Sequence, residues 1–226
     1  MFSRKPRFDE NDQEHEEDSS AHSWSLGTKN NPATTCRELS LIHPPLNDGH
    51  YYIDPNHGCP VDALRVFCNF TAGGVTCVSP VQSNISGIRP SVDRSKKWFS
   101  ELQRGFRFEY KDLDVVQLRF LVLHSNSATQ SIKLLCPKDH RITAENDDQI
   151  KKILYLRGDS NEEIDPSHII ISKHDCEVVV QVRTVCNSEL HRGDVTLLPI
   201  RDVSVEVTGE NWKEDVSVVL GPLCFL

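Results

Sequence analysis

Apolar residues in the second half of the chain follow patterns that predict β-strands. Valine alternates with polar residues over 203–207, which is typical of a strand with one buried face. The apolar stretches 178–180 and 216–220 indicate two further strands. The mostly apolar run 115–123 also fits a half-buried strand. This half of the chain is therefore predicted to be rich in strands.

Two segments show helical spacing instead. Pro60 suits the first position of a helix over 60–68, and Gly158 suits the end of a helix over 147–157 that begins with acidic residues. The apolar residues on the two predicted faces are Leu64, Phe67, Cys68, Ile150, Ile153 and Leu154. A stretch rich in Ser, Pro and Gly, 79–95, is expected to be a long loop. Since no internal repeat is present, these elements predict an α+β fold with mainly antiparallel strands.

The N-terminal residues differ in composition from the rest. Residues 8–19 hold seven acidic residues and no Lys or Arg, and Ser, Gly, Asn and Pro follow up to Pro32. Such a segment has too little apolar surface to form a core. We therefore predict a disordered acidic and polar segment over 1–31 and one folded domain over 32–226.

Charge and hydropathy exclude some classes of partner. The formal net charge of −8 argues against nucleic acid and anionic membrane as partners, because both require a positive face. No apolar run approaches the roughly 18 residues that are needed to span a bilayer. The start of the chain also lacks the apolar stretch of a signal peptide. We interpret the chain as a fragment of a longer secreted precursor, with a mispredicted first exon as the alternative.

The cysteines indicate a secreted protein. No two of the eight form a C-x-x-C pair, the usual mark of a zinc or redox site. Their even number and wide spacing favour disulfides, and therefore an oxidising compartment. Reduced core cysteines in a cytosolic protein are the alternative. The eight are Cys36, Cys59, Cys68, Cys77, Cys136, Cys176, Cys186 and Cys224.

Two N-x-S/T sequons, at Asn69 and Asn84, also favour secretion and glycosylation. Asn84 lies in the predicted loop and is the better acceptor. Asn69 directly follows a cysteine, so we expect it to be sterically restricted.

The loop 54–62 gathers short side chains that carry oxygen. Ca²⁺ binds six to eight oxygen atoms at about 2.3–2.6 Å, from carboxylates, amides and carbonyls. Asp54, Asn56 and Asp62 supply side-chain oxygens, and the carbonyls of His57 and Cys59 are able to complete the shell. The spacing is not that of an EF-hand. An Asx-turn followed by a helix cap is the alternative.

No motif indicates an enzyme. The ten histidines form neither H-x-x-x-H nor H-E-x-x-H, and neither G-x-S-x-G nor a Gly-rich phosphate loop is present. Scattered, solvated histidines are the simpler interpretation, and each cysteine has a structural role available. We predict a protein that is not an enzyme.

Several segments in a fixed order resemble one known family. They read NPATTCREL at 31–39, HPPLNDGHYYIDPNHGC at 43–59, VFCNFTAGGVTC at 66–77, WFSELQRG at 98–105, VQLRFL at 116–121 and GPLCFL at 221–226. The stretch 31–226 is similar to the C-terminal propeptide, the non-collagenous C-terminal domain, of fibrillar procollagens. The residues of the CNFTAGG and WFSE segments are most similar to those of the type V/XI group.

The resemblance implies a fold and a function. It implies a strand-rich lobe similar to fibrinogen-like domains, joined to a disulfide-stapled base region that trimerises. It implies that Ca²⁺ binds in the loop 54–62 where protomers meet, through the side chains and carbonyls named above. The expected function is calcium-dependent trimerisation and chain selection of procollagen in the extracellular matrix. Partners would be other procollagen chains and a processing protease that cuts upstream of the domain.

The resemblance also implies how the cysteines pair. The intrachain pairs would be Cys36–Cys68, Cys77–Cys224 and Cys136–Cys176. The family's interchain bond joins a cysteine just before the His-Pro to the position of Cys59, but this chain has Ile42 there instead. Cys59 therefore lacks its usual partner, and Cys186 has no counterpart in the family.

Two further points separate the possible functions. The family's chain-selection segment maps onto 149–168, whose charged residues suit discrimination between partners; a solvated charged helix is the alternative. These residues are Lys151, Lys152, Arg157, Asp159, Glu162 and Glu163. The alternative function, a secreted, calcium-dependent fibrinogen-like lectin, would need a ligand pocket near the C-terminus with its own metal site, and the sequence shows no second acidic loop there. A thiol enzyme would need a free cysteine of low pKa.

Overall fold

The computed structural model describes most of the chain beyond the N-terminal segment. The described residues are 25–57, 59–88, 96–135, 147–151, 153–174, 177–185, 197–206 and 216–226. Most of the predicted disordered segment 1–31 lies outside these residues, as do Cys136, Cys176 and Cys186.

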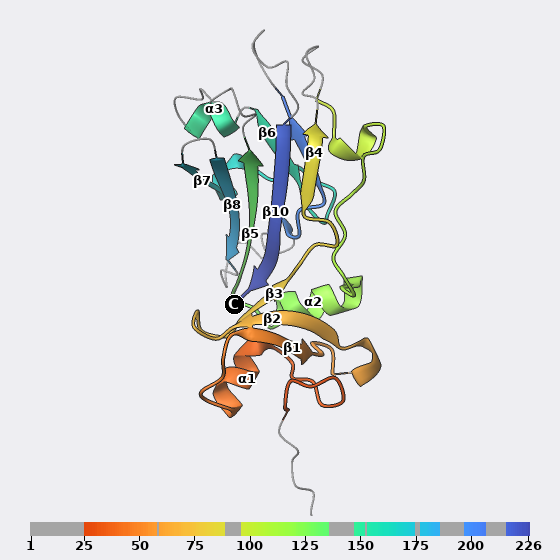
Figure 1. The fold of residues 1–226 in the computed structure, drawn as a ribbon, viewed down its shortest axis with the longest axis vertical. Helices are drawn as coiled ribbons and strands as arrows, with labels where there is room; N and C mark the ends of the chain where they lie inside the picture. The colour runs from red at the N-terminus through yellow and green to blue at the C-terminus, as the bar shows by residue number, and fades with distance from the viewer. Residues whose placement is uncertain are drawn as a thin grey trace, which may run out of the picture.

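An antiparallel sheet of eight strands runs through the described part of the molecule (Figure 1). Its strand order is β1-β2-β3-β10-β5-β8-β7, and β4 pairs with β10 beside this path. The strands are β1 (Gly49–Ile53), β2 (Leu64–Asn69), β3 (Val75–Val78), β4 (Asn84–Ile88), β5 (Ser127–Leu135), β7 (Ile169–His174), β8 (Glu177–Val185) and β10 (Val216–Phe225). A second, two-stranded sheet joins β6 (Leu154–Arg157) to β9 (Asp202–Val205).

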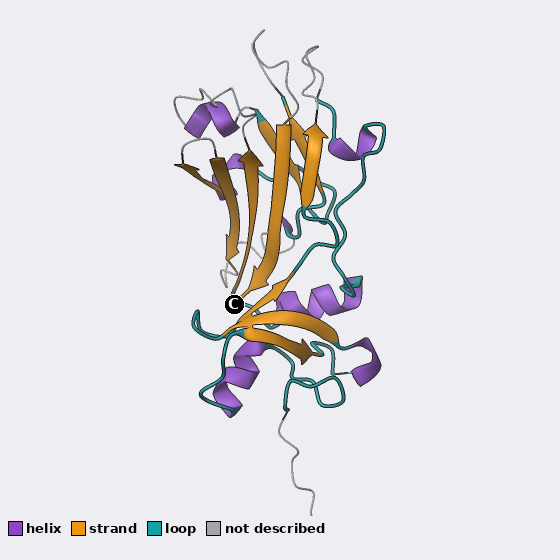
Figure 2. Cartoon of the chain, viewed as in Figure 1, coloured by secondary structure: helices purple, strands orange, loops and turns teal. Residues whose placement is uncertain are grey.

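The helices are short and lie around the sheet (Figure 2). The α-helices are α1 (Cys36–Ile42), α2 (Val115–Leu123) and α3 (Asp147–Lys151), and the 3₁₀ helices are η1 (Pro60–Asp62), η2 (Phe99–Glu101) and η3 (Pro166–His168). We call residues 25–57 and 59–78 together with α2 the base region. The predicted α+β class with mainly antiparallel strands is confirmed, including the strands expected at 178–180 and 216–220. The strand expected over 203–207 is found as β9, which ends at Val205, and residue 207 lies outside the described residues.

The segment 115–123 is helix α2, so the predicted strand there is wrong. Asp114 caps the helix, because its carboxylate accepts hydrogen bonds from the backbone N–H groups of Val116 and Gln117. The helix buries Gln117, Leu118 and Leu121 on one side. A nearly continuous apolar run fits a buried strand and a buried helix equally well, and the cap decides between them.

The predicted helix over 60–68 is also wrong beyond its first turn. Pro60 does begin a helix, but η1 ends at Asp62. Leu64, Val66 and Cys68 are then buried alternately in β2, which pairs with both β1 and β3. Pairing on both edges satisfies the backbone of this segment, and a helix would not provide that.

Two other predicted boundaries need correction. The helix expected over 147–157 ends at Lys151, and residues 154–157 form β6, paired with β9. The loop expected over 79–95 contains the strand β4, which pairs with β10 and buries Ile85 in the core. In both cases the partner strand lies far away in the sequence.

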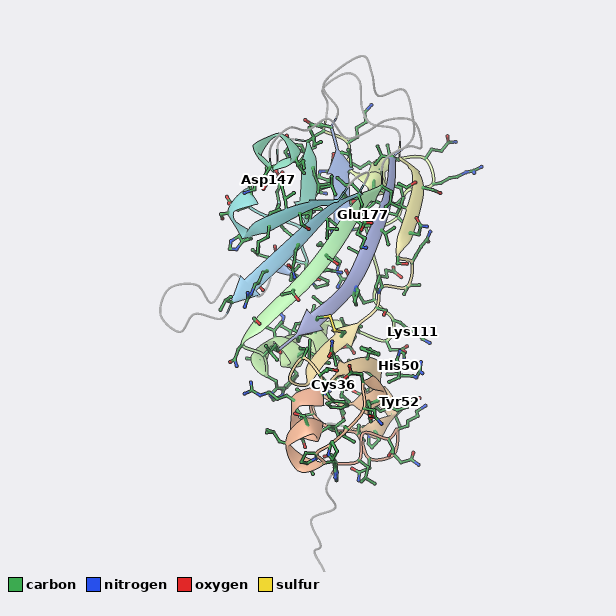
Figure 3. All side chains as sticks on the ribbon, turned by 60° about the vertical axis from the view of Figure 1, so that its left-hand side comes forward. Cys36, His50, Tyr52, Lys111, Asp147 and Glu177 are labelled. Atoms are coloured by element: carbon green, nitrogen blue, oxygen red, sulfur yellow. A yellow bond between two sulfur atoms is a disulfide. The ribbon has the colours of Figure 1, made fainter. Side chains whose placement is uncertain are left out.

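One disulfide lies within the base region, and a second joins the base region to β10. Cys36–Cys68 links the start of α1 to β2, and Cys77–Cys224 links facing residues of β3 and β10. Both predicted pairs are confirmed; Figure 3 labels Cys36 and shows disulfides as yellow bonds. The bond Cys77–Cys224 closes a loop with a sequence separation of 147 residues. In the chain-entropy model such a bond stabilises the folded state by about 5 kcal/mol, because it lowers the conformational entropy of the unfolded chain.

A hydrogen-bond network joins the start of α1 to the loop that follows β1. Glu38 accepts hydrogen bonds from the Thr34 backbone N–H (2.6 Å) and from the Ser25 hydroxyl (3.1 Å). The Thr34 hydroxyl in turn bonds to Nε2 of His57 at 2.5 Å. Burial alone would raise the pKa of Glu38, but the hydrogen bonds from Thr34 and Ser25 and the nearby His57 outweigh it and lower the pKa below 4.5.

The cap of α2 gives a first prediction. Asp114→Ala removes the acceptor for two N–H groups and should lower the free energy of unfolding by about 1 kcal/mol. Asp114→Asn keeps an acceptor oxygen and should cost much less. Urea unfolding followed by tryptophan fluorescence measures both. An equal loss in the two variants would contradict the capping role.

Glu38 gives a second prediction. Its pKa is lower in the folded than in the unfolded state, so its contribution to stability is present above the unfolded pKa and is lost as pH falls through the folded value. Glu38→Gln should therefore be less stable than the parent chain at neutral pH, and the difference should shrink below pH 4.5. Urea unfolding at a series of pH values tests this, with the exposed Glu109→Gln as the control for losing one acidic residue. A difference that grows on acidification would show that the network does not act in this way.

Candidate metal centre

The loop after β1 turns back on itself and presents its oxygen atoms inward. Asp54 is 4% exposed, and its backbone N–H donates to the carbonyl of Ala33 at 2.6 Å. The N–H of His57 donates to the carbonyl of Asp54, and His57 has a positive φ of 52°. This left-handed residue is what reverses the chain direction. Gly58, which follows it, lies outside the described residues.

Three of the predicted ligands meet around one atom. Nε2 of Gln117 lies 3.4 Å from Oδ1 of Asp54, 3.2 Å from Oδ1 of Asn56 and 3.0 Å from Oδ2 of Asp62. It also lies 3.2 Å from the carbonyl of Asp62. The Asn56 amide further donates to Oδ2 of Asp62 at 3.3 Å. The carboxylates that the sequence placed in one loop therefore do lie together in space.

The two predicted carbonyl ligands lie on either side of residue 58, His57 at the end of the turn that begins at Asp54 and Cys59 at the start of η1. The carbonyl of Cys59 accepts a hydrogen bond from the N–H of Asp62 at 3.1 Å. The His57 ring is held by Thr34, as described above, which fixes the backbone from which its carbonyl extends. The Cys59 thiol is free and exposed. A ligand role for these five residues stays a prediction.

Gln117 was not predicted to belong to this site. It lies in α2, 55 residues from Asp62 in the sequence, and it is 1% exposed. The only signal in the sequence is a polar residue inside the apolar run 115–123. Polar residues at buried positions of an apolar element often mark a site.

The donor set fits calcium. No group of three or more His, Cys, Asp and Glu side chains able to hold a metal occurs in the described part of the chain. The loop instead offers two carboxylates with amide and carbonyl oxygens, and such an all-oxygen set is what Ca²⁺ prefers.

The two sequons lie on different strands. Asn84 is exposed at the start of β4. Asn69 is partly buried at the end of β2, its Oδ1 accepts from the N–H of Ala72, and the Thr71 hydroxyl of its sequon donates to Asp48. Asn84 thus remains the more accessible of the two predicted acceptors, and glycosylation stays a prediction.

Charged residues of the expected chain-selection segment, 149–168, have partners within the chain. Glu163 pairs with Lys96 at 2.6 Å, and Asp159 pairs with Arg201 at 2.7 Å. Arg157 stacks over the Trp98 ring at 3.9 Å. Glu162 is exposed, Lys151 is partly buried, and Lys152 lies outside the described residues.

The third predicted disulfide also lies outside the described residues. The register of β5 and β8 ends with Leu135 facing Glu177, and these are the sequence neighbours of Cys136 and Cys176. The pair Cys136–Cys176 stays a prediction.

The described helices include none that is long and apolar enough to cross a membrane.

The chain matches a family model described as fibrillar collagen C-terminal domain over residues 17–225. A collagen alpha-1(II) chain from Xenopus tropicalis is 35% identical over 225 residues, which cover 88% of this chain and 14% of that protein. A collagen alpha-1(II) chain from Gallus gallus is 31% identical, with 88% of this chain and 25% of that protein covered.

The chain therefore spans a quarter or less of the length of these relatives. Both are type II chains, so the greater similarity to the type V/XI group stays a prediction. The family model covers nearly all of the chain, in agreement with the segments that resemble procollagen propeptides. The chain belongs to the fibrillar collagen C-terminal domain family.

Proposed function

We propose that this chain is the calcium-dependent trimerisation and chain-selection module of a fibrillar procollagen. The observation that carries the proposal is the cluster of oxygens from Asp54, Asn56 and Asp62 around a single point in the base region. In this role the chain is structural and not an enzyme. It acts in the extracellular matrix after secretion, and a processing protease removes it by cutting upstream.

Calcium would act by bridging two carboxylates that repel one another without it. Asp54 and Asp62 bring two negative charges to the same atom of Gln117, and one of the two carboxylates is buried. A divalent cation neutralises this pair and fixes the ends of β1 and η1 relative to α2. The carbonyls of His57 and Cys59 would complete its shell.

Exposed apolar residues next to this cluster support a contact with another chain. Val61, beside Asp62, is 83% exposed, and Val115 and Val116 are 61% and 46% exposed in the first turn of α2. Large apolar side chains gathered at one exposed place often mark an interface. A metal that orders η1 and α2 would order this surface, which links calcium to trimerisation.

For chain selection we propose the segment 149–168. Its ion pairs with Lys96 and Arg201 hold Glu163 and Asp159 in place, and a fixed charge pattern discriminates between partners better than a mobile one. Lys151 and Glu162 would then be available to a partner chain. A calcium-dependent lectin is the second candidate from the sequence, but the family match does not favour it.

The metal centre gives a third prediction. Asp54→Asn keeps the shape of the side chain but removes its charge, so Ca²⁺ affinity should fall about tenfold or more and trimers should dissociate at calcium concentrations that preserve the parent trimer. Calorimetric titration and sedimentation, each with and without chelator, measure the two effects. Asp48→Asn, at the other end of β1, is the matched control. A parent trimer that chelator leaves unchanged would overturn the calcium proposal.

The free Cys59 gives a fourth prediction. Ile42 at the end of α1 provides no sulfur, so a homotrimer of this chain should be non-covalent and should run as a monomer on a non-reducing denaturing gel. Cys59→Ser should leave Ca²⁺ affinity unchanged, because only the carbonyl of this residue is a proposed ligand. Disulfide-linked species should form when a chain that retains the missing cysteine is co-expressed. A reducible trimer of this chain alone that persists in Cys186→Ser would contradict the prediction.

A further inference from the structure

The amide nitrogen of Gln117 lies among the oxygen atoms of the predicted calcium site. An amide carries two hydrogens, yet Nε2 of Gln117 lies within 3.4 Å of four oxygen atoms from Asp54, Asn56 and Asp62. Two hydrogens cannot serve four acceptors well. The oxygens converge on this point more closely than hydrogen bonding to one amide requires, and such convergence is characteristic of ligands around a metal ion.

The other end of the same amide has no partner among the described residues. Oε1 of Gln117 is buried and accepts no hydrogen bond from the described part of the chain, and the residue is 1% exposed. A buried carbonyl oxygen without a partner is unfavourable and rare in folded proteins.

Gln130 shows that the fold is able to satisfy a buried glutamine. It is also 1% exposed, but its Nε2 donates to the Tyr110 hydroxyl and to the carbonyl of Gly221, and its Oε1 accepts from the N–H of Ile200 at 2.8 Å. The missing partner of Gln117 is therefore a local property of the loop 54–62 and its surroundings.

We propose that Gln117 is a direct calcium ligand through Oε1, an inference that rests on the proposed calcium site. A half-turn of the amide about the Cγ–Cδ bond exchanges Oε1 and Nε2 without moving the backbone. In the metal-free protein Nε2 donates to the loop oxygens and holds them together. With Ca²⁺ bound, the amide presents Oε1 to the metal, so the buried oxygen gains a partner, and its N–H groups turn to the place that Oε1 leaves. The loop oxygens then bind the cation in place of the N–H donor.

This role makes α2 part of the metal centre. Gln117 belongs to the same short helix as Val115 and Val116, the exposed apolar residues of its first turn, so a ligand at Gln117 would act on them by fixing the position of the helix. A ligand on α2 would transmit metal occupancy to this apolar surface directly, without passing through the loop.

The test compares Gln117→Met, Gln117→Glu and the control Arg119→Gln in the full chain. Gln117→Met keeps the volume but removes the oxygen, and Gln117→Glu replaces it with a charged one. Arg119→Gln changes the net charge by the same amount as Gln117→Glu, but from an exposed position two residues along α2, where side chains at i and i+2 do not face each other. Ca²⁺ affinity is measured by calorimetry, and the waters on bound Tb³⁺ are counted from luminescence lifetimes in H₂O and D₂O.

We expect Gln117→Met to bind Ca²⁺ about tenfold more weakly and to leave about one more water on Tb³⁺, because a solvent oxygen replaces the lost ligand. Gln117→Glu should bind more tightly than the parent with no added water, and Arg119→Gln should change affinity much less. If Gln117→Met does not fold, the comparison of Gln117→Glu with Arg119→Gln decides alone.

Two results overturn the inference. One is unchanged or tighter Ca²⁺ binding by Gln117→Met with the same number of waters on Tb³⁺ as in the parent. Gln117 would then only occupy the site in the metal-free protein and would not be a ligand. The other is a Gln117→Glu variant that binds no more tightly than Arg119→Gln. If the parent binds Ca²⁺ and Asp54→Asn weakens it, either result removes Gln117 alone from the site. A parent chain that binds neither Ca²⁺ nor Tb³⁺ removes the proposed calcium function as well.

Discussion

The C-terminal strand β10 makes the pairing on which the rest of the fold depends. It pairs with β3, β4 and β5, so the end of the described chain joins strands from its first half to the strands of the second. The disulfide Cys77–Cys224 covalently fixes the contact with β3. Without β10 the base region and the second half of the sheet would share no strand ladder, because the sheet order passes through it.

The candidate metal centre depends on this arrangement. The loop 54–62 follows β1 at one end of the sheet, whereas Gln117 arrives on α2, which precedes β5 in the chain. The base strands and β5 are held in one sheet by β10, and α2 thereby reaches the loop. The oxygens of the site are thus brought together by long-range pairing as well as by the local turn at His57.

The chemistry of the site and the proposed assembly function both depend on the burial of negative charge. Asp54 is buried, and a buried carboxylate near a second one is unfavourable unless donors or a cation compensate for it. Gln117 supplies such a donor through its amide nitrogen. The proposed calcium site, in which loop, helix and cation meet, would be well suited to controlling a surface such as that formed by Val61, Val115 and Val116.

The sequence by itself determined the strand-rich class, the oxygen-bearing loop and, through resemblance to the family, the pairs Cys36–Cys68 and Cys77–Cys224. These depend on local patterns and on motifs of fixed order, which the residues display directly. The tertiary structure alone decided that strands β2 and β6 follow helices shorter than predicted, and that Gln117 belongs to the site. The helix over 115–123 is set by its local cap, Asp114. Apolar runs fit strand and helix equally until a cap or a distant partner strand selects one. Gln117 meets its neighbours across 55 to 63 residues of sequence, and only the folded chain brings such distant positions together.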